Sequence, residues 1–278
     1  MRLLCIGDNV VDRYLDLGVM YPGGNCVNVA VFASRLGAEV AYAGVLGDDP
    51  AGRLVLASLR AEGVDVSHTR VEHGTNAYAL VRLVDGDRRF QGSDKGVSLF
   101  DLDAAEIELA QGYDVVHTAY SARWLDQLPK LIGAGCRVAY DAGHDFSPAS
   151  IAGLPGLWLA AFSGSHLDDA EAERTARASL AAGSRHVLIT QGPRGARLWS
   201  PEGSWFHPAA DIPVLDTLGA GDAYLASVIL SLTGTDDPAE AMAKGSALAA
   251  EVITVQGAFG HGAPDPGVPA TQGVNRWA

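Results

Sequence analysis

The chain has 278 residues, and its 20 Lys+Arg against 33 Asp+Glu give a formal net charge of −13. A chain of this length buries roughly three quarters of the surface that its unfolded form exposes, so we expect one large domain. The acidic balance argues against a nucleic-acid partner, because affinity for a phosphate backbone depends on clustered basic residues, and the lysines are limited to Lys95, Lys130 and Lys244.

Cysteine usage and apolar run lengths indicate the compartment. Cys5, Cys26 and Cys136 are widely spaced, sit among apolar residues and form no Cys-x-x-Cys pair, which is typical of packing residues in a reducing compartment. No apolar run approaches the roughly 20 residues that span a bilayer, and the first apolar stretch is too short for a signal peptide. We therefore expect a cytoplasmic protein without a membrane partner.

Short apolar runs alternate with segments of helical periodicity along most of the chain. The predicted strands are Arg2–Ile6, Glu39–Leu46, Tyr113–Thr118, Arg137–Asp141, Leu157–Phe162 and His186–Gln191. The predicted helices are Asn25–Leu36, Ala51–Ala61, Arg123–Ile132 and Asp168–Ala182. This alternation is typical of βαβ units, so we expect an α/β fold whose mostly parallel sheet carries helices on both faces.

Residues 69–91 break this alternation. Asp85-Gly86 separates two extended runs, and Asp-Gly in this position predicts a β-hairpin. Arg13–Leu17 is a candidate further strand. Spacing alone leaves open whether these strands form a small accessory sheet or an edge hairpin on the main sheet. The C-terminal segment 262–278 is rich in Pro and Gly, lacks periodicity and is predicted to be loosely ordered.

The segment Asp216-Thr-Leu-Gly-Ala-Gly-Asp222 precedes the apolar run Ala223–Leu230. Its glycines permit a tight turn with exposed N–H groups, and the apolar run supplies a helix whose N-terminus favours anions. Asp222 then lies in the first helical turn, where its carboxylate can accept a hydroxyl proton beside a phosphoryl group. Taken alone, the pattern is also satisfied by an Asp that only caps its helix.

Other catalytic and nucleotide-binding motifs are absent from the sequence. There is no Gly-x-x-x-x-Gly-Lys-Ser/Thr phosphate loop and no Gly-x-Ser-x-Gly nucleophile turn. The one Gly-x-Gly-like turn lies near the C-terminus without the downstream acidic residue of a dinucleotide site. The histidines show no metal-ligand spacing with cysteine or with one another.

The segment Gly23-Gly-Asn-Cys-Val-Asn-Val-Ala30 opens the first predicted helix. Its two glycines let a ligand approach the backbone, and Asn25 and Asn28 share one helix face. Amides both donate and accept hydrogen bonds, which suits the hydroxyls of a polyol. The alternative is a Gly-rich loop with Asn25 as the N-cap and Asn28 as a polar residue on a half-buried helix.

These two segments, with Leu36-Gly37, Gly44, Gly47-Asp-Asp49 and Gly52, resemble the two signatures of the ribokinase-like (PfkB) carbohydrate kinases. The match extends from Ile6-Gly-Asp8 to about His261 and is most similar to the fructoselysine 6-kinase branch, on Ile6–Asp12, Gly23–Val31, His73-Gly-Thr75 and Gln256–His261. The resemblance implies a three-layer ribokinase-like fold over residues 1–278 as a single domain. It also implies a small antiparallel β-sheet lid, inserted from about 12–20 and 69–95, in place of an edge hairpin.

The resemblance further implies ATP-dependent phosphorylation of a primary sugar hydroxyl, with O6 of a fructosamine as the preferred acceptor and ATP and Mg²⁺ as cofactors. Asp222 would be the catalytic base, beside an anion hole made by the backbone of Gly219, Ala220 and Gly221. The sugar contacts would be Asp8, Asp12, Gly24, Asn25 and Asn28. The nucleotide contacts would be Thr190, Gly192, Gly195, Thr217, Ala249 and Ile253.

Two segments depart from the family pattern. Ser165-His-Leu-Asp168 stands where the family usually has Asn-x-x-Glu near the Mg²⁺–phosphate water shell, so Asp168 is the implied, indirect metal residue. Asp141-Ala-Gly-His-Asp145 stands where many members carry Asp-x-Asn-x-Arg, and the Arg is missing. The family's lid often doubles as a dimer clasp, so the resemblance implies a homodimer through the lid.

Several alternatives to a fructosamine kinase remain at this point. The same fold and signatures serve kinases for other ketohexoses, for sugar phosphates and for nucleosides. A non-catalytic sugar-binding protein on the kinase fold is favoured by the two departures. The intact Gly219–Asp222 segment argues against that last alternative, since a binding protein has no need of a base at an anion hole.

Overall fold

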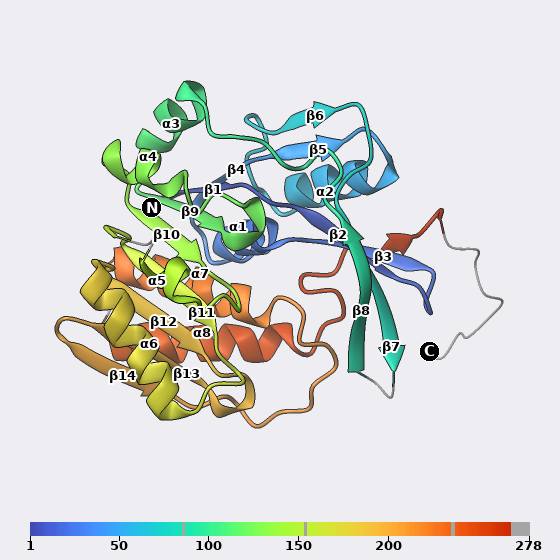
Figure 1. Cartoon of the computed structure of the whole chain (residues 1–278). Helices are drawn as coiled ribbons and strands as arrows, with labels where there is room; N and C mark the ends of the chain where they lie inside the picture. The colour runs from blue at the N-terminus through green and yellow to red at the C-terminus, as the bar shows by residue number, and fades with distance from the viewer. Residues whose placement is uncertain (85–86, 153–154, 235–236, 268–278) are drawn as a thin grey trace.

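The computed structural model describes residues 1–84, 87–152, 155–234 and 237–267 (Figure 1). An eight-stranded sheet in the order β14-β13-β12-β11-β10-β9-β1-β4 runs through its centre. Its strands are β1 (Arg2–Ile6), β4 (Glu39–Ala43), β9 (Val115–Ala119), β10 (Val138–Asp141), β11 (Leu159–Ser163), β12 (His186–Thr190), β13 (Ala196–Ser200) and β14 (Gly203–His207). Within this order, β12, β11, β10, β9, β1 and β4 pair in parallel, whereas β13 and β14 pair antiparallel. The expected mostly parallel sheet is therefore confirmed.

Helices cover both faces of this sheet, as expected, because each face presents its own apolar side chains. One core lies between the sheet and the helices α1 (Asn25–Arg35), α2 (Pro50–Ala61), α7 (Ala220–Thr233) and α8 (Pro238–Val252). The other lies against α3 (Ala104–Gln111), α4 (Leu128–Gly133), α5 (Pro148–Ala152) and α6 (Asp169–Ala182). The result is the three-layer arrangement of helices, sheet and helices (Figure 1).

A second, five-stranded sheet stands beside this body (Figure 1). Its order is β15-β3-β2-β7-β8, with β2 (Val10–Tyr14), β3 (Val19–Gly23), β7 (Tyr78–Val84), β8 (Asp87–Asp94) and β15 (Ala263–Pro264). All neighbours are antiparallel except β2 and β7. The register of Val84 opposite Asp87 confirms the predicted hairpin, although Asp85-Gly86 itself lies outside the described residues. The hairpin pairs with β2 and not with the main sheet, so the accessory-sheet alternative is the correct one.

Three predicted elements differ from the structure by more than two residues at a boundary. The candidate strand Arg13–Leu17 begins three residues earlier, as β2. The strand predicted at Glu39–Leu46 is two strands, β4 and β5 (Val45–Gly47), and β5 pairs with β6 (Arg70–Glu72), so the first part of 69–95 lies outside the small sheet. The helix predicted from Arg123 begins at Leu128, because Arg123 adopts a left-handed backbone conformation (φ 61°) after the short 3₁₀ turn η1 (Tyr120–Ala122).

The start of the C-terminal segment is ordered, which corrects the prediction for residues 262–267. Ala263–Pro264 forms β15 against β3. The Arg13 guanidinium donates to both carboxylate oxygens of Asp265, at 2.6 and 2.7 Å, and this contact fixes the segment to β2. Residues 268–278 lie outside the described residues. Within the ranges that are described, no helix has the length and apolarity needed to cross a bilayer.

Candidate active site

The N-terminus of α1 is held by a carboxylate from another element. Gly24 is the N-cap, with φ 102°, and a Cβ atom there would lie 2.7 Å from the Cα atom of Asn9, so a side chain is excluded. Asp8, in the loop after β1, accepts the backbone N–H groups of Asn25 (3.1 Å) and Cys26 (3.2 Å) instead. Asp8 therefore caps α1, and Asn25 is the first helical residue, so the alternative of Asn25 as N-cap is wrong.

Asp222 lies in the first turn of α7, and its side chain faces α1. The Nδ2 atom of Asn25 donates to Oδ1 of Asp222 at 2.8 Å, and the Nδ2 atom of Asn28 donates to Oδ2 at 2.6 Å. Burial raises the pKa of Asp222 to about 7, with a smaller contribution from the nearby Asp141 and Asp8 charges, while the two amides oppose the shift. The carboxylate is thus positioned by α1, and its pKa lies close to neutral pH.

Two residues to which the sequence assigns no role at the site complete this network. Asp141, at the carboxyl end of β10, accepts from Nδ2 of Asn25 at 2.7 Å and from the Gly143 amide at 2.7 Å, and burial raises its pKa to about 6. His117, on β9, lies with its Nε2 atom 2.7 Å from Oδ1 of Asn25, and burial lowers its pKa to about 4. His117 and its neighbour Thr118 are the two polar residues of the fully buried strand β9, and a histidine in a buried strand is the one signal that marks His117.

Hydrogen-bond acceptors lie beside Asp222. The Oδ1 atom of Asn28 is buried and has no hydrogen-bond partner within the described part of the chain. A Cβ atom at Gly23 would lie 3.2 Å from Oδ2 of Asp12 and 3.7 Å from Oδ1 of Asn28, so both oxygens flank the bare face of that glycine. Asp12 belongs to β2, so the small sheet contributes one side of this acceptor group. Buried acceptors of this kind match the hydroxyl donors of a sugar.

The N-terminus of α7 forms the predicted cradle. Gly219 is its N-cap, with φ 76°, and a Cβ atom there would lie 2.7 Å from the Cβ atom of Ala258. Gly221 has open space where a side chain would be, with no atom within 4 Å in the described structure. The first amides of a helix lack intrahelical acceptors and carry a partial positive charge, so Gly219, Ala220 and Gly221 together suit an anion.

Asp216 fixes the loop that leads into this cradle. Its Oδ1 atom accepts the Leu218 amide at 2.9 Å, and its Oδ2 atom accepts the Gly257 amide at 3.0 Å and the Tyr14 hydroxyl at 3.2 Å. Tyr14 lies on β2, so this single buried carboxylate joins the cradle to the small sheet. Thr217, the next residue, is exposed.

The predicted nucleotide residues form a separate group. Thr190 ends β12, and the 3₁₀ turn η2 (Gly192–Arg194) and Gly195 lead into β13, so these residues form a hairpin turn between two antiparallel strands. Ala249 and Ile253 lie at the end of α8, and the Ile253 carbonyl accepts the amides of Leu215 (2.8 Å) and Asp216 (3.2 Å). In the sheet, β11, β10 and β9 separate β12, which carries Thr190, from β1, which leads to Asp8. A ligand that reaches both groups must cross the carboxyl ends of those strands.

Asp168 is the N-cap of α6. Its Oδ1 atom accepts the Glu171 amide at 2.7 Å, and the Glu171 carboxylate accepts the Asp168 amide at 2.9 Å. Across the described ranges, no group of three or more His, Cys, Asp or Glu side chains could hold a metal ion by itself. An indirect role for Asp168, through water on a magnesium ion that phosphate oxygens carry, therefore stays a prediction.

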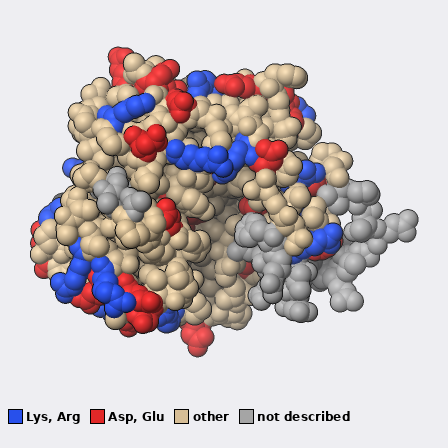
Figure 2. Space-filling view, in the orientation of Figure 1, with Lys and Arg blue, Asp and Glu red and all other residues tan. Residues whose placement is uncertain are grey.

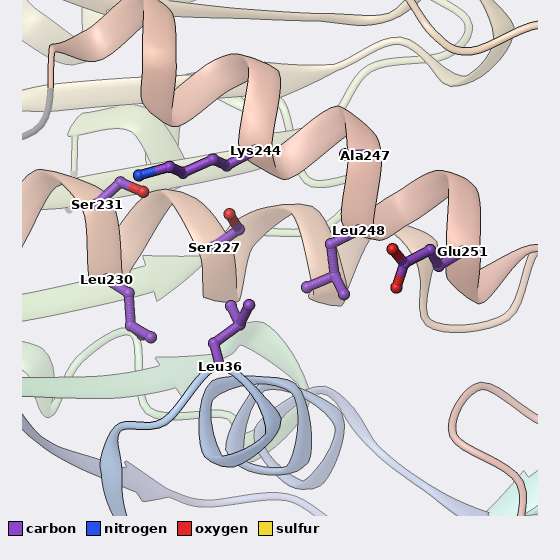
Figure 3. Close-up of a pocket in the computed structure, with 8 residues that line it drawn as sticks. All are labelled: Leu36, Ser227, Leu230, Ser231, Lys244, Ala247, Leu248 and Glu251. Atoms are coloured by element: carbon purple, nitrogen blue, oxygen red, sulfur yellow. The ribbon is translucent and has the colours of Figure 1, made fainter.

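The face viewed in Figure 2 is hollowed between the α/β body and the small sheet, with basic side chains across the top of the hollow. A different groove, of about 470 Å³, lies over α7 and α8 (Figure 3). It is lined by Leu36, Ser227, Leu230, Ser231, Lys244, Ala247, Leu248 and Glu251. None of these belongs to the hydrogen-bond network of Asp222, so this groove is distinct from the candidate active site.

Comparisons with known proteins agree with this geometry. The model of the pfkB family carbohydrate kinases matches residues 9–123 and 159–265. A fructosamine kinase from Bacillus subtilis is 36% identical over 95% of this chain and 95% of its own length. A fructoselysine 6-kinase from Escherichia coli is 34% identical over 92% of this chain and 99% of its own.

Solved structures show the same fold. The ribokinase of Arabidopsis thaliana, complexed with ribose and ATP, superposes with a TM-score of 0.81 at 18% identity, over 93% of this chain and 94% of that one. A fructokinase from Xylella fastidiosa with bound ATP gives a TM-score of 0.76 at 21% identity, with the same coverage. With the family model matched over most of the chain and two relatives above 30% identity, the chain belongs to the PfkB family of carbohydrate kinases.

Proposed function

We propose that the chain transfers the terminal phosphoryl group of ATP to the 6-hydroxyl of a fructosamine such as fructoselysine. The observation that carries this proposal is the Asp222 carboxylate, held by Asn25 and Asn28 beside the N-terminus of α7. The substrate class is supported by the similarity to a fructosamine kinase and to fructoselysine 6-kinases at 34–36% identity over most of the chain.

Asp222 is suited to the proton transfer that this reaction needs. Above its pKa of about 7 the carboxylate is ionised and can accept the proton of a sugar hydroxyl as that oxygen attacks phosphorus. The Asn25 and Asn28 amides orient both oxygens before the sugar arrives. The acceptors at Asp12 and Asn28 would bind neighbouring hydroxyls of the same sugar, with Asp8 and Gly24 fixing α1 behind them.

The remaining predicted residues would hold the nucleotide. The backbone of Gly219, Ala220 and Gly221 lies at the helix N-terminus, with open space beside Gly221, and would stabilise negative charge on a transferring phosphoryl group. Thr190, Gly192, Gly195, Thr217, Ala249 and Ile253 would contact the rest of ATP. Mg²⁺ supplies further charge neutralisation on the phosphates when bound, and Asp168 would hold one of its water molecules.

The small sheet would serve as the lid. It supplies Asp12 to the sugar side and is linked through Tyr14 and Asp216 to the cradle. Closure of this sheet over the sugar would exclude water and so limit hydrolysis of ATP. Pairing of two subunits through the lid stays a prediction, for which sedimentation or light scattering is the test.

An ADP-release assay over a panel of acceptors tests the proposal. The panel contains fructoselysine, other fructosamines, free fructose, ribose, fructose 1-phosphate and nucleosides, and NMR of the product locates the new phosphate. We expect kcat/KM for fructosamines to exceed that for free fructose at least tenfold, with phosphate on O6. Activity on fructose 1-phosphate alone would contradict the substrate assignment, and sugar binding by calorimetry without ADP release would contradict catalysis.

A further inference from the structure

The side-chain amide of Asn25 makes three hydrogen bonds, and these use every donor that it has. Its Nδ2 atom donates to Oδ2 of Asp141 at 2.7 Å and to Oδ1 of Asp222 at 2.8 Å. An amide NH₂ group has two protons, so neither remains for a substrate. Its Oδ1 atom faces Nε2 of His117 at 2.7 Å. Asn25 is therefore a bridge between two carboxylates, with a histidine behind it.

The partners fix both the orientation of the amide and the proton of the histidine. Carboxylates accept, so the NH₂ group must face Asp141 and Asp222, and the oxygen must face His117. His117 is fully buried in β9, and burial keeps its ring neutral near pH 7, with one proton. That proton must lie on Nε2, since the Asn25 oxygen can only accept. A flipped amide would place its oxygen against two carboxylates.

We infer that His117 is a positioning residue, which locks the Asn25 amide so that its N–H groups face Asp141 and Asp222 and thereby fixes the catalytic carboxylate. The inference rests on the proposed function, because it assigns Asp222 as the base. Asp141 is the second fixed point of the same amide. His117 itself would touch neither sugar nor ATP, since the amide of Asn25 lies between its ring and Asp222.

The electrostatic surroundings give this role a signature in the pH dependence. The groups that act on Asp222 are Asp141 from β10, Asp8 from the loop after β1, Tyr120 from η1 and, through Asn25, His117 from β9. The Asn25 hydrogen bond lowers the pKa of Asp222 and the two carboxylates raise it. An Asn25 amide that is free to rotate donates to Asp222 less of the time, so the pKa of Asp222 rises. The acid limb of the activity profile then moves to higher pH.

His117→Leu is the primary test, with His186→Leu as the matched control. His186 is also on a strand of the main sheet, and burial lowers its pKa to about 4 as well, but it lies at the start of β12 against Trp158. We expect His117→Leu to lower kcat at least tenfold, to change KM for ATP less than twofold and to move the acid limb upward. His186→Leu should leave kcat and the limb unchanged.

His117→Gln should restore much of kcat, because the Gln Nε2 group can occupy the position of the histidine Nε2 and donate to Asn25. If both His117→Leu and its control keep the wild-type kcat and acid limb, the inference is overturned and the contact is structural. The inference also fails if Gln restores nothing while Leu and Gln both fold.

A measurement on the wild-type protein keeps the test independent of turnover. Nitrogen-15 NMR of the histidine rings distinguishes the two neutral tautomers, and we expect His117 to carry its proton on Nε2 between pH 6 and 8. A proton on Nδ1 would overturn the inference even if no variant folds. Absence of turnover with every acceptor would overturn the proposed function, while the tautomer measurement would still decide the orientation of Asn25.

Discussion

A negative charge on Asp222 is unfavourable, because the half-buried side chain is partly desolvated and lies near Asp141 and Asp8. Two amide donors compensate for only part of this, so its pKa rises to about 7 in the folded protein from roughly 3.9 in an unfolded chain. Between these two values the folded state binds more protons than the unfolded state. Asp222 therefore lowers the free energy of unfolding progressively as the pH rises from about 4 to 7.

Asp222→Asn should separate catalysis from stability. We expect kcat to fall by roughly 10²–10⁴, the range for loss of a general base, while the melting temperature at pH 8 stays equal or rises because the buried charge is gone. Steady-state ADP release and thermal denaturation measure the two effects. Asp114→Asn is the control and should keep kcat. Asp114 accepts the Arg2 amide just before the start of β9, outside the hydrogen-bond network of Asp222. Near wild-type turnover in folded Asp222→Asn would show that this residue is not the base.

The pH dependence of kcat/KM should show an acid limb. Activity is expected to rise with pH and to reach its half-maximum near pH 7, as Asp222 loses its proton. Asp141 shares the Asn25 amide and has a pKa raised to about 6, so the limb belongs to the coupled pair. Initial rates at low sugar concentration from pH 5 to 9 measure this limb. A flat profile over that range would contradict a base of this pKa.

At this scale the sequence predicts the base and its two amide partners, because each lies in a short glycine-containing motif. It does not predict Asp141 or His117 as members of the network. These residues lie 116 and 92 positions from Asn25, and only the order of the strands in the sheet brings them together. The sequence pattern also assigns Asn25 to the sugar, whereas both of its donors bind carboxylates of the protein.

At the scale of elements, α7 depends on two glycines for different reasons. Gly219 requires a positive φ and close approach to Ala258, whereas Gly221 has open space where a Cβ atom would lie. Gly219→Ala should therefore destabilise the protein by roughly 1–2 kcal/mol and lower kcat. Gly221→Ala should leave the melting temperature within about 2 °C, as small surface changes do, and raise KM for ATP. Denaturation and ATP kinetics on the pair test this, and equal destabilisation by both variants would contradict it.

Element boundaries were predictable where local chemistry sets them. Gly37 follows the end of α1, and Asp85-Gly86, which lie outside the described residues, follow the end of β7 at Val84, as the sequence predicts. The start of α4 was not predictable in this way, because Arg123 adopts a left-handed conformation that its own residue type does not favour. The pairing of β5 with β6 likewise depends on a distant partner strand rather than on local propensity.

On the scale of the whole molecule, the Arg13–Asp265 ion pair fastens the end of the described chain to the small sheet. The carboxylate is nearly inaccessible, with 1% of its side chain exposed, against 23% for Arg13. Burial raises the pKa of Asp265, but the Arg13 guanidinium and the Gly267 amide more than offset this, so the pKa is lowered overall. The pair thus stabilises the fold above the unfolded pKa, and that stability is lost as the pH falls through the lower, folded value.

Asp265→Ala should release β15 and loosen the sheet next to it. We expect a loss of about 3 kcal/mol, as for removal of one partner from a buried ion pair, with faster amide exchange in β3 and a higher KM for the sugar. Asp16→Ala is the control, because the ion pair of Asp16 with Arg82 joins the same sheet but is more exposed, with 51% of the Arg82 side chain and 35% of the Asp16 side chain accessible. This pair should contribute under about 1 kcal/mol. Hydrogen exchange distinguishes the two variants. Equal protection of β3 in both would contradict an anchoring role for Asp265.

The contact between Arg13 and Asp265 spans 252 positions, and β15 pairs with a strand from the first tenth of the chain. During synthesis β15 becomes available only after the strands of the α/β body, so the five-stranded sheet cannot be completed until the chain through Asp265 has left the ribosome. A nascent chain that ends before β15 would hold most of the α/β body but an incomplete sheet beside Asp12. The pairing of β15 with β3 thus makes the small sheet a late part of the fold to assemble.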